Sequence, residues 1–302
     1  MGIKEPIGIV ILNYRTWEKT LSCVESIYNT YLGAKEIIIV DNQSPNDSFL
    51  QLKNKYNTNE YKNVTVIQTE KNGGFSYGNN YGFDYIVKHF PDITKIIITN
   101  NDIIFKEGTI EKLVNAFKYS DKVVMTAPSV YNVTGERTNA PWKKKPTVIQ
   151  EIGLKSFNGC AYEWSELNVN LPVYMVCGCC FAVDRDKFQS IKRFDENVFL
   201  YNEENIFSVK IAEKGLQIIY CPDADIIHDH GSTTGNSNVF VDKEYVKSTL
   251  YFMKHYEHLS NSKIYLLRWF YTLRILAKKV LRKYDNSQNL LKAIKEIFKY
   301  KV

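Results

Sequence analysis

The sequence lacks several features that would place it in other classes. No apolar run approaches the ~20 residues that a membrane-spanning helix requires. The G-x-G-x-x-G motif of dinucleotide-binding domains and the G-x-x-x-x-G-K-[ST] motif of P-loops are both absent. The N-terminal glycine signature of nucleotidyltransferases that make sugar nucleotides is absent too. The first residues do not have the layout of a signal peptide, so we expect a cytoplasmic protein.

Paired C-x-x-C units are also lacking, although the chain has six cysteines. Cys177, Cys179 and Cys180 lie in an apolar run over residues 173–183, which predicts a strand. Alternation along a strand sends neighbouring thiols to opposite faces, which is poor geometry for one tetrahedral zinc ion. We therefore interpret the cysteines as small, buried, reduced side chains, with zinc binding as the alternative.

The chain lacks net positive charge outside the C-terminal segment. Residues 239–302 contain fourteen Lys and Arg against five Asp and Glu, whereas the formal net charge of the whole chain is only +6. The first 238 residues are therefore net negative. A nucleic-acid-binding protein more often carries its basic residues around a recognition motif, so we expect no nucleic-acid partner.

Strand-like and helix-like segments alternate through the first half. Apolar runs predict strands over residues 7–12, 36–40, 64–68, 95–99 and 123–127. Helical patterns fall between them, over residues 16–28, after Ser44-Pro45, within 74–89 and over 107–118. This order predicts an α/β fold: a mostly parallel, doubly wound sheet with helices on both faces.

The pattern breaks over residues 129–171, which we interpret as a long irregular excursion over the active face. A strand over 173–183, a helix over 204–214 and a strand over 217–220 then return to the core. The segment from Lys243 onward is helical in character.

Polar residues follow the first four strands where each one ends. The stretches are Asn13-Tyr14-Arg15, Asp41-Asn42-Gln43-Ser44, Asn72-Gly73-Gly74-Phe75 continuing to Asn80, and Asn100-Asn101-Asp102. In a parallel sheet these endings share the edge where ligands bind. There Asp41 can accept a hydrogen bond from a pyrimidine base, and Gly73 and Gly74 let the backbone approach a phosphate. Asp102 suits a divalent cation shared with a phosphate-bearing substrate, or alternatively it caps a turn.

Two further clusters carry titratable groups. Glu203 and Glu204 open a helix that Asn202 can cap. They offer a general base for an acceptor hydroxyl, although acids in a first turn also stabilise a helix by ~0.3–1 kcal/mol. The segment from His228 to Ser232 suits metal or phosphate binding, with His228 as the preferred ligand and His230 second.

Together these residues resemble the family 2 glycosyltransferases of the GT-A fold, and most of all their bacterial rhamnosyltransferase-like branch. The matching stretches run in the expected order from about residue 6 to 235, from the strand that ends on Asn13 and Tyr14 to His228 and Ser232. The resemblance implies a GT-A catalytic domain over residues 1–238, with a nucleotide-sugar half (1–128) and an acceptor half (129–238). Residues 239–302 would be a basic helical extension.

The resemblance implies an inverting, hexosyl-type transfer from a UDP- or dTDP-sugar to a hydroxyl of a growing, lipid-linked surface glycan. By position, Glu204 matches the family's base and Glu203 the preceding acid. Asp102, with His228, would hold Mg²⁺ or Mn²⁺, and Gly178 and Trp142 would contact the acceptor. The remaining strand-end residues would bind the nucleotide sugar: Asn13, Tyr14, Arg15, Asp41, Asn42, Ser44, Gly73, Gly74, Phe75, Asn80, Asn100 and Asn101.

The metal motif departs from the commoner family pattern because it keeps only its last acid, Asp102. Metal binding would then be weak or depend on His228. The alternative function is therefore a catalytically silent relative that binds nucleotide or scaffolds an assembly at the membrane. A homodimer is left open.

The C-terminal segment is amphipathic. Residues 264–283 place one set of apolar residues opposite a basic set: Leu266, Trp269, Leu273, Leu276 and Val280 against Arg268, Arg274, Lys278, Lys279, Arg282 and Lys283. A second stripe has Leu290, Leu291, Ile294, Ile297 and Phe298 opposite Lys292, Lys295 and Lys299. These helices either pack on the catalytic core or a partner, or they attach to an anionic membrane surface at the inner face of the cell membrane.

Overall fold

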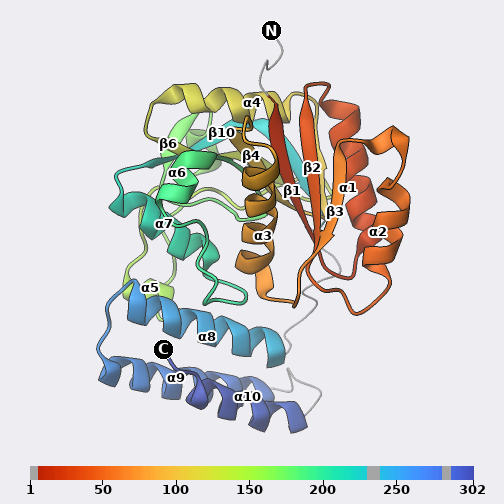
Figure 1. Ribbon diagram of the computed structural model, residues 1–302. Helices are drawn as coiled ribbons and strands as arrows, with labels where there is room; N and C mark the ends of the chain where they lie inside the picture. Colours follow the sequence, from red (N-terminus) through yellow and green to blue (C-terminus); the bar gives the residue numbers. More distant parts are fainter. Residues whose placement is uncertain (1–5, 230–238, 281–286) are drawn as a thin grey trace.

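The structure is a computed structural model that describes residues 6–229, 239–280 and 287–302. Figure 1 shows a central sheet with helices on both faces and further helices at one end of the molecule. The predicted boundary after residue 238 adjoins a stretch outside the described residues.

Four parallel strands form one half of the sheet, in the order β3-β2-β1-β4. They are β1 (Ile7–Asn13), β2 (Lys35–Asp41), β3 (Val64–Gln68) and β4 (Lys95–Asn100). Their β-branched side chains are buried on both faces; Ile96, Ile97 and Ile98, for example, are fully buried. The predicted parallel arrangement is confirmed, and the polar endings of these strands share one edge as expected.

The second half of the sheet is mixed and continues in the order β9-β6-β10-β5. Strand β9 (Cys180–Asp184) runs antiparallel to both β4 and β6 (Val123–Tyr131), and β10 (Gln217–His228) runs parallel to β6. Three short strands pair antiparallel at the margins: β5 (Ile103–Phe105), β7 (Arg137–Thr138) and β8 (Leu171–Val173).

Helices bury both faces of the sheet, as the doubly wound prediction requires. One core layer lies under α1 (Trp17–Thr30), α2 (Ser48–Tyr56) and α4 (Thr109–Asn115). The other lies under α3 (Gly74–His89), α6 (Arg185–Ser190) and α7 (Glu203–Glu213). Short elements complete this part: α5 (Val148–Glu151), η1 (Asn59–Tyr61), η2 (Ala116–Tyr119) and η3 (Trp164–Glu166).

Three element predictions need correction. The strand expected over 217–220 continues as β10 to His228. The strand expected over 173–183 is two strands, because β8 pairs with β10 whereas β9 pairs with β4 and β6. The residues between them leave the sheet and border the cleft described below. The helix expected directly after Ser44-Pro45 begins only at Ser48, with Asp47 at its N-cap. Ser44 instead accepts a hydrogen bond from the backbone N–H of Arg15 (2.8 Å).

The C-terminal helices are α8 (Val239–His255), α9 (Asn261–Val280) and α10 (Ser287–Lys299). Helix α8 packs against the segment that carries the acidic pair: Ser248 donates to the carbonyl of Leu200 (2.6 Å), and Asn202 donates to Thr249 (3.1 Å). Helices α9 and α10 lie outside α8 (Figure 1). None of the described helices is long and apolar enough to cross a membrane.

The packing face of α9 differs from the stripe chosen from the sequence. Ile264, Leu267, Tyr271 and Ile275 are buried, whereas Leu266, Trp269, Leu273 and Leu276 are exposed. Both sets recur at helical spacing, so the pattern alone could not tell which one packs. On α10, Leu290 and Ile297 of the predicted stripe are buried, whereas Leu291 is exposed. The structure does not describe the side chains of Val280, from the predicted apolar stripe, or of Lys279, Arg282 and Lys283, from the basic set.

Candidate active site

The ends of β1, β2 and β4 are joined by one buried hydrogen-bond network. Asn13 donates to Asp41 (2.8 Å), and Asn101 donates to Asn13 (3.1 Å). The other carboxylate oxygen of Asp41 accepts from the backbone N–H of Ser44 (2.9 Å) and from Gln68 (3.0 Å). The sequence placed Asn13, Asp41, Asn101 and Ser44 at one edge, and the structure brings them into contact there.

Tyr14 and Arg15 continue from this network. Arg15 adopts a left-handed backbone conformation (φ 68°), and its guanidinium lies 5.0 Å from the centre of the Tyr14 ring. The turn thereby presents both side chains beyond the end of β1.

The start of α3 is pinned to the segment that leads into the acidic pair. A Cβ on Gly74, whose φ is +87°, would lie 1.9 Å from the carbonyl oxygen of Phe199, to which Phe75 N–H donates (3.1 Å). The close backbone approach predicted for Gly74 is therefore made to this protein's own chain. Asn42 supports the turn by donating to the carbonyl of Gly74 (3.0 Å). A Cβ on Gly73 would meet the ring of Tyr77, so its space is also taken within the chain.

Asn80 is likewise used inside the protein. Its amide donates to Glu196 (2.7 Å) and to the carbonyl of Phe194 (3.1 Å), and its oxygen accepts from the N–H of Phe194 (3.2 Å). Because Asn80 is only 2% exposed, these contacts hold the loop before α7 in place. The pocket-shaping position predicted for Asn80 is thus a contact between α3 and that loop.

A cleft of about 590 Å³ gathers most of the remaining predicted residues. The predicted residues that line it are Phe75, Asn100, Asp102, Trp142, Gly178, Glu203, Glu204 and His228. They come from α3, the loop after β4, the irregular segment 139–157, the crossing between β8 and β9, α7 and the end of β10. Residues more than a hundred positions apart in the sequence therefore meet around one cavity.

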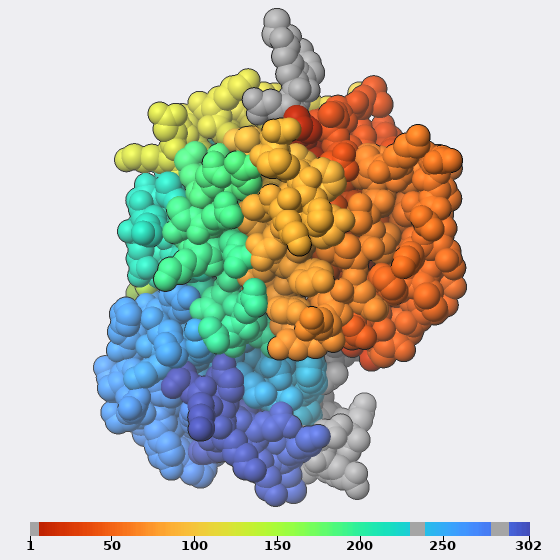
Figure 2. All heavy atoms as spheres, viewed as in Figure 1, coloured from red at the N-terminus to blue at the C-terminus, as the bar shows by residue number. Residues whose placement is uncertain are grey.

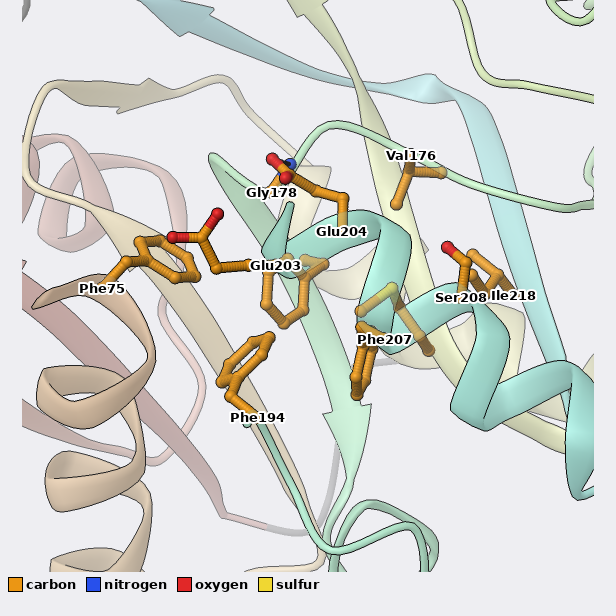
Figure 3. A pocket seen from close by; sticks show the side chains of 11 residues that line it. Phe75, Val176, Gly178, Phe194, Glu203, Glu204, Phe207, Ser208 and Ile218 are labelled. Atoms are coloured by element: carbon orange, nitrogen blue, oxygen red, sulfur yellow. Dashed lines mark hydrogen bonds between the residues drawn. The ribbon is translucent and has the colours of Figure 1, made fainter. Parts of the chain in front are cut away.

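Glu204 points toward Gly178, whose backbone N–H donates to its carboxylate (3.1 Å; Figure 3). A Cβ on residue 178 would lie 2.7 Å from that same oxygen, so the glycine makes room for the carboxylate. Burial raises the pKa of Glu204, while the Gly178 N–H opposes the rise by stabilising the charged form. The local structure thus holds a basic carboxylate in a fixed orientation.

Glu203 points the other way, toward Phe75 (Figure 3). Phe194 and Phe207 lie beneath the pair and line the small pocket under it. Burial raises the pKa of Glu203, and the negative charge of Glu204 raises it further. Its Oε1 atom accepts no hydrogen bond from the described residues. The two carboxylates therefore have different surroundings although they are adjacent in sequence.

Asp102 and His228 also line the cleft and face each other. The Nε2 atom of His228 lies 3.2 Å from Oδ1 of Asp102, and the backbone N–H of Asp229 donates to the Asp102 carbonyl (3.0 Å). Two ligands on one edge of an octahedron, each ~2.1 Å from Mg²⁺, are ~3 Å apart. Oδ1 of Asp102 is buried and accepts no well-aligned hydrogen bond from the described residues. The pair offers two ligands to a divalent cation, and no group of three or more possible metal ligands lies together among the described residues. His230 lies outside the described residues.

Several residues of the cleft were missed by the sequence analysis. Glu151, Phe157, Asn205 and Tyr245 line it. Asn205 donates to Glu151 (3.1 Å), and the ring of Phe157 lies 4.9 Å from that of Trp142. Burial, and next the charge of Glu257, raise the pKa of Glu151 to about 7. The irregular segment that carries Glu151 and Phe157 has no periodicity that would have indicated which side chains face the cleft.

The six cysteines are free thiols in the structure, and all except Cys177 are buried. Burial raises the pKa of Cys180 to about 12. This agrees with their interpretation as small core residues.

Comparison with known proteins identifies the class of this fold and site. The sequence profile of the family described as "Glycosyl transferase family 2" matches residues 8–192. The chain therefore belongs to glycosyl transferase family 2, and the resemblance that the strand-end residues indicated is confirmed.

Two curated relatives are glycosyltransferases by name. "Low-salt glycan biosynthesis hexosyltransferase Agl10" of Haloferax volcanii is 24% identical over 225 residues, which cover 74% of this chain and 67% of that protein. "N-acetylglucosaminyl-diphospho-decaprenol L-rhamnosyltransferase" of Mycobacterium tuberculosis is 23% identical over 209 residues, which cover 64% of this chain and 67% of that protein.

The solved structure of GalNAc-T7 with UDP, GalNAc and Mn²⁺ has a similar fold, with a TM-score of 0.58 at 16% sequence identity. The likeness covers 89% of this chain but only 55% of the GalNAc-T7 chain. It concerns the fold alone, and it agrees with the predicted GT-A architecture.

Proposed function

We propose that this protein transfers a sugar, with inversion, from a UDP- or dTDP-sugar to a hydroxyl of a growing, lipid-linked surface glycan. The observation that carries the proposal is the placement of Glu204 and Asp102 around a single cleft. The names of the two relatives support it, since one acts in glycan biosynthesis and the other on a diphospho-decaprenol substrate.

Glu204 is the general base in this proposal. The raised pKa of Glu204 lies closer to neutral pH than the pKa of an ordinary glutamate, and the N–H of Gly178 fixes the orientation of the carboxylate. When the acceptor hydroxyl attacks the anomeric carbon, Glu204 takes the hydroxyl proton as the new glycosidic bond forms. The bond to the nucleoside diphosphate breaks on the opposite side of the sugar. Glu203, which is more deeply buried, keeps the site dry and orders the first turn of α7.

Asp102 and His228 would hold Mg²⁺ or Mn²⁺, which when bound neutralises charge that develops on the departing diphosphate. Asn13, Asp41 and Asn42 would lie at the base and ribose, with Tyr14, Arg15 and Asn100 beside them. Asp41 is fully buried and accepts three hydrogen bonds, so a base can reach its carboxylate only if a side chain that covers it moves.

The acceptor would enter past Trp142 and Gly178. The neighbouring rings of Trp142 and Phe157 offer an apolar surface for a sugar ring, and Glu151 and Asn205 offer groups for its hydroxyls. Tyr245 of α8 lines the cleft, so the C-terminal helices adjoin it. This placement suits a lipid-linked acceptor, with the protein working at the inner face of the cell membrane.

A catalytically silent, nucleotide-binding relative is the second candidate, favoured by the single acid of the metal motif. The discriminating experiment is a panel of UDP-, dTDP- and GDP-sugars with Mn²⁺, read by thermal stabilisation and by release of nucleoside diphosphate. Our proposal expects one donor to stabilise the protein and to be hydrolysed slowly. It also expects Asp102→Asn to lose both effects. Stabilisation by a donor with no hydrolysis, and no transfer to any lipid-linked acceptor, would favour the silent relative.

A further inference from the structure

The outer face of α9 carries an apolar stripe that the described residues leave exposed over much of its surface. The exposed fractions of its members are Leu266 66%, Trp269 47%, Leu273 60% and Leu276 39%. These residues recur every three or four positions and so lie on one side of the helix. The opposite side, with Leu267 and Tyr271, already provides the packing against the rest of the chain.

The stripe continues onto α10. The ring of Trp269 packs edge-on against that of Phe298 (5.0 Å), and Leu291 of the same helix is 66% exposed. Figures 1 and 2 show α9 and α10 together at the end of the molecule farthest from α4. We call this surface, made of Leu266, Trp269, Leu273, Leu276 and Leu291, the outer apolar face.

Two kinds of basic residue accompany this face. Arg268 and Lys278 serve the fold: Arg268 donates to the carbonyls of Ile297 and Phe298, and Lys278 pairs with Asp242. Lys263, Lys292, Lys295 and Lys299 are instead exposed. Helix α9 contains no acidic residue. An isologous dimer through this face would bring these like charges together, whereas an anionic lipid surface would be attracted to them.

The outer apolar face is connected to the acceptor side of the cleft. Tyr245 of α8 lines the cleft, and its ring lies 6.3 Å from that of Tyr271 on the inner side of α9. Arg274 of α9 donates to the carbonyl of Ile152 (3.3 Å), next to Glu151 in the cleft wall. Only α9 itself therefore separates a surface bound to its outer face from residues of the cleft wall.

We propose that the outer apolar face docks on an anionic lipid bilayer and lies parallel to its surface, with the leucines and Trp269 in the interface and the exposed lysines at the headgroups. The exposure of these side chains is the evidence for the docking itself. Its use, to present a lipid-linked acceptor to the cleft, rests on the proposed function.

Vesicle co-sedimentation of the full chain tests this proposal. Binding is expected to phosphatidylcholine vesicles that contain phosphatidylglycerol, and to weaken with salt. Leu266→Ser and Leu273→Ser should each weaken binding ~10-fold, because each removes a leucine from the buried set. Lys292→Gln should weaken it ~5-fold on anionic vesicles and leave binding to neutral vesicles unchanged. The matched control is Leu50→Ser, since Leu50 lies on α2 and is 60% exposed, as Leu273 is.

Absence of vesicle binding by the wild type, or equal binding by Leu273→Ser, would overturn the proposal. So would a solution dimer that Leu273→Ser dissociates without any vesicle binding, because the face would then join two copies. Donor hydrolysis, measured without vesicles, separates the two hypotheses. It should persist in Leu273→Ser if only docking fails, and it should be absent from the wild type if the proposed function fails.

Discussion

Replacement of Glu151 by Gln should stabilise the protein at alkaline pH and leave it unchanged in acid. Glu151 is only 6% exposed, and burial, helped by Glu257, raises its pKa from 4.5 to about 7. A folded-state pKa above the unfolded value means that the stability of this group is full below pH 4.5 and is lost as pH rises to about 7. The loss amounts to ~3 kcal/mol by pH 8, as an upper bound.

Gln at this position keeps an oxygen for the amide of Asn205 but cannot ionise, so it avoids that loss. The assay is thermal unfolding of Glu151→Gln and the wild type over a pH series. We expect a Tm several degrees higher for the variant at pH 8 and no difference near pH 4. The control is Glu166→Gln, since the N–H of Glu163 lowers the pKa of Glu166 and no gain at pH 8 is expected. A variant that is destabilised equally at both pH values would refute the reasoning.

Three further predictions concern Gly178, Gly74 and Glu204. Gly178→Ala places a Cβ 2.7 Å from the Glu204 carboxylate and should lower kcat ~10²-fold while donor affinity persists, measured by steady-state kinetics and calorimetry. Gly74→Ala should lower the free energy of unfolding by more than the ~1–3 kcal/mol that a positive φ costs a residue other than glycine, because the new Cβ also meets the Phe199 carbonyl. Denaturant titration measures this loss. The control is Gly135→Ala, since Gly135 has a φ of +84° but open space around it, so the difference between the two variants isolates the clash. The raised pKa of Glu204 should place the midpoint of the acid limb of the kcat–pH profile above the pKa of an ordinary glutamate. A midpoint at or below that pKa would contradict the role of Glu204 as the base.

The parallel half of the sheet and its functional edge could be predicted because the information is local. Buried runs such as the one ending at Asn100 are bounded by polar residues, and parallel strands must bring those endings together. The resemblance to the family, rather than this logic, brought Asp102, His228 and Glu204 together, and all three line one cleft. The structure bears out this convergence, whereas the roles of these residues stay predictions.

Other features depend on contacts between distant segments. The apolar run that forms β8 and β9 looks like one strand, because only its pairing with β10 and β4 divides it. Glu151 lies in a segment without periodicity, so nothing local indicated that it faces the cleft. The inner and outer stripes of α9 are both apolar, so the packing partner, α8, decides which becomes buried. Gly74 was expected to let the backbone approach a phosphate, whereas the group that it approaches in the structure is the carbonyl of Phe199.

Transfer and donor affinity of Glu204→Gln, measured side by side, test the central claim most directly. Glutamine keeps the size of the side chain and its contact with Gly178 but cannot accept the proton. The account predicts donor binding within about twofold of the wild type and transfer lower by ~10²–10⁴-fold. Transfer by Glu204→Gln at the wild-type rate would contradict it.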